Sequence, residues 1–278
     1  MLKDLLSLGK VLLKSRRPSP APHSSPARPL VIMGNGPSLR SFLAEDPALY
    51  AGCDLMGVNF AAITPEFFSV RPNLYILADP HFFKKDNSDP KVADLWKNLT
   101  EADWDITLFL PTNTPKWITD NLNSGSNHLH VRTYNLTPVE GSTPLSRALI
   151  KGGLGMPRPR NVLIPAIMMG MRAGYKKIYL VGADHTWSQS LWVDDKNRVV
   201  SVQPHFYKDN KEEEDRVAAE YAGYHLHDIL NSLTIAFRSY HAIADLARRE
   251  GVEILNATPG SFIDAFPRCD YSSIGSAD

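Results

Sequence analysis

Seven short apolar runs, each ending at loop residues, constrain this chain more than any other feature. They occupy residues 29–34, 54–59, 73–79, 105–111, 128–134, 176–184 and 251–257. The runs are continuous rather than alternating, which is typical of strands covered on both faces of a parallel sheet. Helical patterns lie between them, most clearly at 161–174 and in a charged segment of about 211–250, with Gly251 as its C-terminal cap. The sequence therefore predicts an α/β fold: a Rossmann-like, doubly wound, mainly parallel sheet with helices on both faces.

The two ends of the chain differ from this pattern. Residues 1–17 place leucines among lysines and arginines, which predicts a short basic amphipathic helix. Two alternatives remain for this helix: it lies on an anionic membrane face, or it packs on the domain or a partner chain. Residues 18–28 are rich in proline and serine and are expected to form an extended, mobile linker. The folded domain is then expected to span 29–268, with 269–278 as a flexible tail.

Composition narrows the classes of function. The 278 residues suffice for one large α/β domain, or for one domain with a substantial subdomain. Thirty basic residues balance thirty acidic ones, which argues against nucleic acid as the main partner. The cysteines are Cys53 and Cys269, so a reducing compartment fits better than a disulfide framework. No apolar run is long enough to span a bilayer. We expect a cytoplasmic protein, at the inner membrane face if the N-terminal helix binds lipid.

The first apolar run ends in a glycine-rich loop. Its residues are Gly34, Asn35, Gly36, Pro37 and Ser38. Glycines let a backbone approach a phosphate, and Ser38 or the following helix N-terminus can donate to it. The loop is neither a Walker loop nor a dinucleotide fingerprint, because no Gly-Lys-Ser/Thr follows and Leu39 and Arg40 take the last places. The sequence predicts a nucleotide-binding loop, with a simple strand-to-helix turn as the alternative.

Three further strand ends carry residues that could bind a ligand or take part in catalysis. Asn59 is the last residue of the second run, where an amide can contact a base or a ribose. "LYILADPH" and "IYLVGADH" each close an apolar strand on an aspartate with a nearby histidine, giving the pairs Asp79/His81 and Asp184/His185. Such pairs can bind ribose hydroxyls, position a base or hold a divalent metal. A polar turn after a strand is the alternative for each pair.

A long polar insertion with aromatic residues, at 185–215, has the character of a lid over a site. Phosphate oxygens need positive or hydroxyl partners. The candidates near the helix at 161 or in the insertion are Arg158, Arg160, Tyr207, Lys208 and Lys211. His185 and His205 are the acid–base candidates, and a solvated surface role is the alternative for each cation.

These residues resemble a known group. "VIMGNGPSL" is similar to the opening strand and loop of the bacterial lipooligosaccharide sialyltransferases, where Gly-Asn-Gly-Pro-Ser-Leu lies at the CMP-sialic acid site. Asn59 and the turn at 79–83 fall where that family has segments near the nucleotide. "MMGMRAGYKKIYLVGADHTW" (168–187) and "ILNATPGSFIDAF" (254–266) also resemble blocks of that family.

The same blocks resemble the MptE-like domain, named for an archaeal 6-hydroxymethylpterin diphosphokinase. This domain also occurs in the motility accessory factors, which are linked to flagellin glycosylation with nonulosonic acids. "YLVGADHTW", followed by "HFYKD", is closer to this second group. The chain departs from the sialyltransferases at their catalytic histidine, near which Thr234 stands, and at their paired tyrosines. The resemblance therefore leaves His185, His205 and the neighbouring Asp184 as the catalytic candidates.

The resemblance implies a glycosyltransferase that moves a sialic acid-like or Kdo-like sugar from a CMP-activated donor onto a glycan or lipid-linked acceptor. CMP is a good leaving group, so this chemistry needs no metal or other cofactor. The alternative enzyme is a diphosphokinase that moves pyrophosphate from ATP onto a pterin-like alcohol. That reaction requires Mg²⁺, with Asp79 and Asp184 as ligands. A third alternative is a non-catalytic nucleotide- or glycan-binding module.

Overall fold

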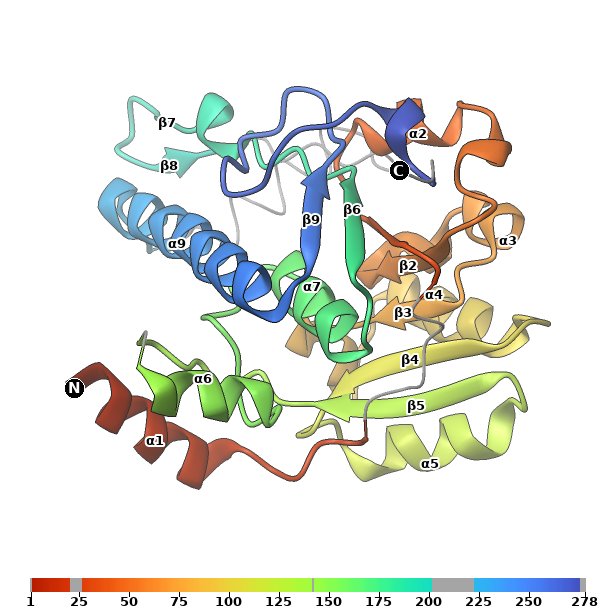
Figure 1. The fold of residues 1–278 in the computed structure, drawn as a ribbon, viewed down its shortest axis with the longest axis horizontal. Helices are drawn as coiled ribbons and strands as arrows, with labels where there is room; N and C mark the ends of the chain where they lie inside the picture. Colours follow the sequence, from red (N-terminus) through yellow and green to blue (C-terminus); the bar gives the residue numbers. More distant parts are fainter. Residues whose placement is uncertain (1, 21–26, 142, 202–222, 276–278) are drawn as a thin grey trace.

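A seven-stranded parallel sheet forms the centre of the molecule in the computed structural model, which describes residues 2–20, 27–141, 143–201 and 223–275 (Figure 1). The strand order is β5-β4-β3-β2-β1-β6-β9, and every neighbouring pair is parallel. The strands are β1 (Leu30–Met33), β2 (Asp54–Val58), β3 (Leu74–Ile76), β4 (Ile106–Pro111), β5 (Leu129–Tyr134), β6 (Lys177–Val181) and β9 (Glu253–Asn256). Each of the seven apolar runs contains one of these strands, so the predicted parallel sheet is confirmed.

Helices flank the sheet on both sides. The α-helices are α1 (Leu2–Lys14), α2 (Leu39–Leu43), α3 (Glu66–Val70), α4 (Pro90–Glu101), α5 (Lys116–Gly125), α6 (Pro144–Lys151), α7 (Leu163–Arg172) and α9 (Leu226–Glu250). Short 3-10 helices are η1 (Pro47–Leu49), η2 (Asn59–Ile63), η3 (Pro80–Phe83), η4 (Trp187–Ser190) and η5 (Tyr271–Ser273). The long helix α9 ends at Gly251, whose left-handed φ of 63° confirms the predicted cap.

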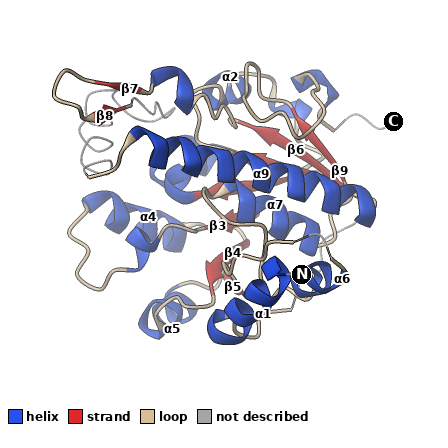
Figure 2. Cartoon of the chain, turned by 90° about the vertical axis from the view of Figure 1, so that its left-hand side faces the viewer, coloured by secondary structure: helices blue, strands red, loops and turns tan. Residues whose placement is uncertain are grey.

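The continuous apolar runs follow from burial on both faces. Leu30 and Ile32 of β1 pack on one side, in a core shared with α7 and α9. These two helices lie side by side in Figure 2. Val31 and Met33 pack on the other side, in a core shared with α2. On that second side, α3, α4 and α5 cover the strands from β3 to β5. The doubly wound arrangement is therefore confirmed, with the strand order reversing direction at β1.

The described part of the predicted flexible tail, 269–275, is instead packed on the domain. The Tyr271 ring lies 5.3 Å from that of Phe42, and Ile274 is buried. The Tyr179 hydroxyl donates to the carbonyl of Ser273 at 2.9 Å. The expectation of a flexible tail is wrong for these residues, because Tyr271 and Ile274 give the segment apolar surface to bury.

The predicted N-terminal helix forms as α1 and packs against α6 (Figure 1). Packing on the domain is thus the alternative that the structure shows. In the predicted linker, the Ser19 N–H donates to the Thr133 carbonyl of β5 at 3.2 Å. None of the described helices combines the length and the apolar character needed to cross a bilayer.

The described part of the predicted insertion contains η4 and a short antiparallel hairpin. Its strands are β7 (Trp192–Val193) and β8 (Val199–Val200). Residues 202–215 of the insertion lie outside the described residues.

Candidate functional site

The loop after β1 packs directly on the loop after β6. The N–H groups of Gly34 and Gly36 donate to the carbonyls of Val181 and Gly182, at 2.8 and 2.9 Å. A Cβ on Gly36 would lie 2.7 Å from the Gly182 oxygen, closer than real Cβ contacts allow. Both glycines are needed because two backbones approach closely here. Their N–H groups are used within the protein, and Pro37 has none.

The Asp184 side chain is bonded to Ser38, the last residue of this loop. Its carboxylate accepts the Ser38 hydroxyl at 2.8 Å and the Ser38 N–H at 3.3 Å, at the start of α2. Burial raises the pKa of Asp184, while the bonds from Ser38 favour its charged form. A carboxylate thus occupies the helix end where a phosphate is predicted. The strand-to-helix turn accounts for this geometry, which does not add support to the predicted phosphate role of Gly34, Gly36 and Ser38.

Two asparagine amides connect the carboxyl ends of β1, β2 and β3. The Asn35 Nδ2 donates to the carbonyl of Val58 at 3.1 Å. Asn59, the next residue, has a left-handed φ of 46°, which asparagine tolerates better than most residues. Its Oδ1 accepts the N–H of Ala78 at 3.3 Å, and its carbonyl accepts the Tyr75 hydroxyl. The predicted residues Asn35 and Asn59 therefore fix the strand ends relative to one another.

A cavity of about 440 Å³ opens beside these strand ends. It is lined by Asn59, Ala78, Asp79, Pro80, Leu136, Pro138, Arg158, Pro159, Arg160, Asn161 and Val162. It brings together Asn59, Asp79 and Arg160, which the sequence predicts as ligand residues from three separate segments. The described lining includes no residue of the loop from Gly34 to Ser38.

Of the predicted Asp79/His81 pair, only Asp79 lines this cavity. Asp79 is exposed, and its Oδ1 accepts the His81 N–H at 2.8 Å, which caps η3. The His81 imidazole turns to Asp89, with Nε2 at 2.9 Å from Oδ2. His81 is not among the lining residues, so Asp79 alone of this pair reaches the cavity.

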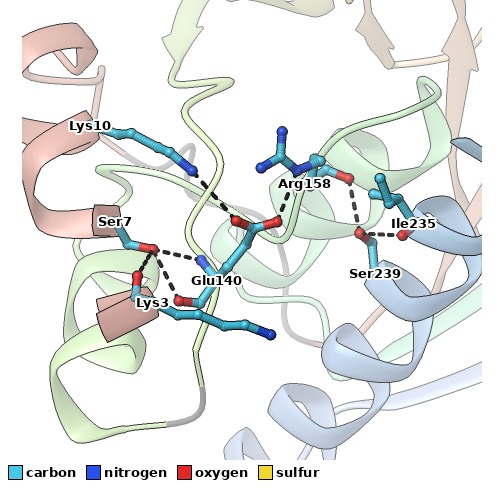
Figure 3. Close-up of polar contacts among 7 residues, drawn as sticks. All are labelled: Lys3, Ser7, Lys10, Glu140, Arg158, Ile235 and Ser239. Carbon is cyan, nitrogen blue, oxygen red and sulfur yellow. Dashed lines mark hydrogen bonds and ion pairs between the residues drawn. The ribbon is translucent and has the colours of Figure 1, made fainter. Parts of the chain in front are cut away.

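Two arginines give the cavity positive charge. Arg158 is held by Glu140, with Nε at 2.9 Å from Oε1, and this contact raises the pKa of the guanidinium (Figure 3). The Arg158 carbonyl accepts the hydroxyl of Ser239 on α9 at 2.9 Å, which fixes the backbone there. Arg160 is exposed and has no ion pair with any described residue. Arg160 is therefore the cation of the lining that is free to meet an anionic ligand.

Behind the cavity wall, Asn161, Tyr240 and His185 form a hydrogen-bonded chain. The Asn161 Oδ1 accepts the Leu163 N–H at 3.0 Å, which orients the amide, and it also accepts the Tyr240 hydroxyl at 2.8 Å. Because the tyrosine hydrogen is used there, His185 Nε2, at 2.7 Å from the hydroxyl oxygen, must carry a proton and donate. The Asn161 Nδ2 is buried and has no partner among the described residues. The wall therefore holds an unused hydrogen-bond donor.

His185 is placed differently from the sequence prediction. It is 8% exposed, lies outside the cavity lining and packs against Trp187, with ring centroids 4.1 Å apart. Burial lowers its pKa to about 3, so the ring is neutral near pH 7. The structure therefore places His185 behind the cavity wall, bonded to Tyr240, and its acid–base role stays a prediction. The other predicted residues of the insertion, His205, Tyr207, Lys208 and Lys211, lie outside the described residues.

Asp79 and Asp184, the predicted Mg²⁺ ligands of the diphosphokinase alternative, lie in different surroundings. Asp79 lines the cavity, whereas Asp184 does not and is bonded to Ser38 through both oxygens. Within the described ranges, no group of three or more histidine, cysteine, aspartate or glutamate side chains is arranged to hold a metal ion.

Asn161 and Tyr240 are the members of the site that sequence reasoning missed. Asn161 stands two residues before the first residue of α7, and its Oδ1 accepts the N–H of Leu163; asparagine often makes such a side-chain bond to the backbone near a helix start. That signal was available, although it indicates a helix start and not a ligand. Tyr240 lies 79 residues further along the chain, and no local pattern pairs the two.

Comparison with known proteins supports the fold. No protein-family model matches the sequence, and no curated protein matches it. Among solved structures, the MAf glycosyltransferase from Magnetospirillum magneticum AMB-1 is similar, with a TM-score of 0.53 and 13% sequence identity. The match covers 100% of this chain and 40% of that enzyme, so the chain spans less than half of its length. Mannonate dehydratase from Streptococcus suis serotype 2 is also found, at 14% identity over 77% of this chain and 56% of that one, with a TM-score of 0.19. This chain therefore shares its Rossmann-like α/β fold with a glycosyltransferase.

Proposed function

We propose that this protein is a glycosyltransferase that transfers a sialic acid-like or Kdo-like sugar from a CMP-activated donor to a glycan acceptor. The observation that carries the proposal is the cavity in which Asn59, Asp79 and Arg160 meet. It lies at the carboxyl ends of parallel strands, where open α/β sheets bind their ligands. The fold shared with a MAf glycosyltransferase supports the same activity, and so does the resemblance of "YLVGADHTW" to the motility accessory factors.

The groups of the cavity suit a nucleotide sugar. The Asp79 carboxylate can accept bonds from ribose hydroxyls, and Asn59 can contact the base or the ribose. The guanidinium of Arg160 faces the negative charge that develops on CMP as its bond to the sugar breaks. Arg158 adds charge, although Glu140 neutralises part of it.

The transfer forms a bond between the acceptor oxygen and the anomeric carbon while the bond to the CMP phosphate breaks. The acceptor proton must pass to a base. We assign this role to His205, because His185 is buried behind the wall and bonded to Tyr240. His185 and Tyr240 then orient Asn161 and do not touch the substrate.

Nucleotide binding tests the proposal through Arg160. CMP is expected to raise the melting temperature of the protein without Mg²⁺. Arg160→Gln is expected to weaken CMP binding by about tenfold or more, since a hydrogen bond to a charged group contributes roughly 1.5–3 kcal/mol. Arg249→Gln, at an exposed arginine on α9 outside the cavity lining, is the matched control and should bind CMP as the wild type does.

Other outcomes lead to different assignments. Stabilisation by ATP only with Mg²⁺, and none by CMP, would replace the proposal with the diphosphokinase alternative. If Arg160→Gln and the wild type bind CMP equally well, the nucleotide-binding site lies outside this cavity. Binding of CMP without turnover of any CMP-activated sugar would indicate a nucleotide-binding module.

A further inference from the structure

Helix α1 docks on the domain through its polar side. Asp4, Ser7 and Val11 are its buried residues, spaced along one face. The Asp4 Oδ1 accepts the hydroxyls of Thr143 and Ser146, each at 2.6 Å. These bonds, above all the one from Ser146, hold the pKa of Asp4 below its usual range, so it is charged and well satisfied at neutral pH.

A second set of hydrogen bonds and ion pairs holds α1 on the domain further along the helix. The Ser7 hydroxyl accepts the Glu140 N–H at 2.9 Å and lies 3.0 Å from the Glu140 carbonyl oxygen (Figure 3). The Glu140 carboxylate bridges Lys10, at 3.4 Å, and Arg158 of the cavity wall, at 2.9 Å (Figure 3). Helix α1 is therefore fixed relative to the cavity by these polar contacts and by the apolar packing of Val11.

The opposite side of α1 is apolar and exposed. Its leucines, with their exposed fractions, are Leu2 (72%), Leu5 (57%), Leu6 (55%), Leu12 (77%) and Leu13 (86%). At 100° per residue these side chains form one stripe, centred opposite the face that carries Asp4, Ser7 and Val11. We call these five residues the leucine stripe. An amphipathic helix normally buries its leucines, whereas α1 leaves these five exposed and buries Asp4.

Basic residues border the leucine stripe. The same helical spacing places Lys3, Lys10 and Lys14 together along one edge of it. Asp4, the sole acidic residue of α1, is turned into the domain, so every charged side chain that the helix leaves partly or fully exposed is basic. Arg16 and Arg17, both exposed, continue the positive charge beyond the helix.

We propose that the leucine stripe inserts into the surface of an anionic lipid bilayer while the polar side of α1 stays docked on the domain. A stripe of leucines with lysines at its edge has the chemistry of an interfacial helix, in which apolar side chains enter the acyl boundary and cations meet anionic headgroups. The lysine edge gives the charge complementarity that selects such a bilayer over a neutral apolar partner. Because α1 is fixed, the lipid surface would lie at a set orientation to the cavity. This inference does not depend on the proposed activity.

Vesicle co-sedimentation with the full chain tests the proposal. Binding is expected to vesicles of phosphatidylcholine with phosphatidylglycerol, and to be much weaker with phosphatidylcholine alone. The double variant Leu6→Gln/Leu13→Gln is expected to lose at least about tenfold in vesicle affinity, because each leucine contributes roughly 1.5–3 kcal/mol when fully buried. Lys3→Gln/Lys14→Gln should lose about thirtyfold in affinity for the anionic vesicles and little for the neutral ones, since each of the two cations near an anionic surface contributes about 1 kcal/mol. Trp117→Gln, at an exposed aromatic residue of α5, is the matched control and should bind like the wild type.

Two results would overturn the proposal. The first is equal binding by the wild type and the Leu6/Leu13 double variant, or no binding by either. The second is a dimer in sedimentation equilibrium that the double variant abolishes, without vesicle binding, which would assign the leucine stripe to a second copy of the chain. Both leucines are exposed, so an unchanged circular dichroism spectrum and melting temperature are expected to show that the double variant is folded.

Discussion

Ser38 donates two hydrogen bonds to Asp184, one from its hydroxyl at 2.8 Å and one from its backbone N–H at 3.3 Å. This pair joins the loop after β1 to the loop after β6, the two strands at which the sheet reverses its order. This contact closes the loop after β1 onto the loop after β6. The glycines allow this closure because they let the two backbones approach closely.

Replacing Gly36 by alanine tests the closure. The new Cβ would lie 2.7 Å from the Gly182 oxygen and would collide with the Asp184 carboxylate. We expect the free energy of unfolding to fall by more than about 2 kcal/mol, measured by urea denaturation. Gly52→Ala is the control: a Cβ there meets nothing within 4 Å, so its effect should stay within about 0.5 kcal/mol. Equal stability of the two variants would contradict the closure.

Stability should depend on pH through His185. Its pKa is lowered to about 3 in the folded protein, against 6.5 for an ordinary histidine. The unfolded chain therefore takes up a proton at His185 between pH 6.5 and 3 that the folded protein does not, so stability falls as the pH drops through this window. Between pH 7 and pH 5 the wild type should lose about 2 kcal/mol more than His185→Gln. Parallel losses in urea denaturation at the two pH values would show that the ring is accessible and titrates normally.

Asn161→Asp tests the cavity wall while keeping an acceptor for the Leu163 N–H. The new carboxylate keeps an oxygen for Leu163 and Tyr240 but replaces the unpartnered Nδ2 donor by an acceptor. We expect CMP affinity, measured by calorimetry, to fall about tenfold or more, since a charged acceptor repels phosphate and a lost bond to a charged group contributes roughly 1.5–3 kcal/mol. Asn113→Asp, at an exposed asparagine outside the lining, should change CMP binding much less. Similar affinities for the two variants would exclude Asn161 from the binding site.

The docking of α1 should depend on Asp4. Asp4→Ala removes the acceptor of the Thr143 and Ser146 hydroxyls, and it should speed hydrogen exchange of the α1 amides. Leu6→Gln changes an exposed side chain of the same helix and should leave this exchange unchanged. If Asp4→Ala also leaves exchange unchanged, the polar dock does not hold the helix.

The sequence predicted the sheet because strands buried on two faces leave continuous apolar runs, as Leu30 to Met33 do. It did not distinguish the roles of Gly34 and Gly36, because a close approach to phosphate and a close approach to backbone require the same residue. The partner that decides between them, Gly182, is distant in sequence. It also did not predict which side of α1 docks, since this depends on Glu140, Thr143 and Ser146. Asn59, Asp79 and Arg160 were predicted separately, and folding alone brings them to one cavity.

A crystal structure of the protein with CMP, grown without Mg²⁺, is the most direct test of whether the nucleotide binds in the cavity. CMP is expected in the cavity, with its phosphate at Arg160 and its ribose or base at Asp79 and Asn59. The Ser38–Asp184 pair should remain intact in that structure. If the CMP phosphate binds instead at the loop from Gly34 to Ser38, and displaces the Asp184 carboxylate from Ser38, the proposal that the cavity binds the nucleotide is wrong.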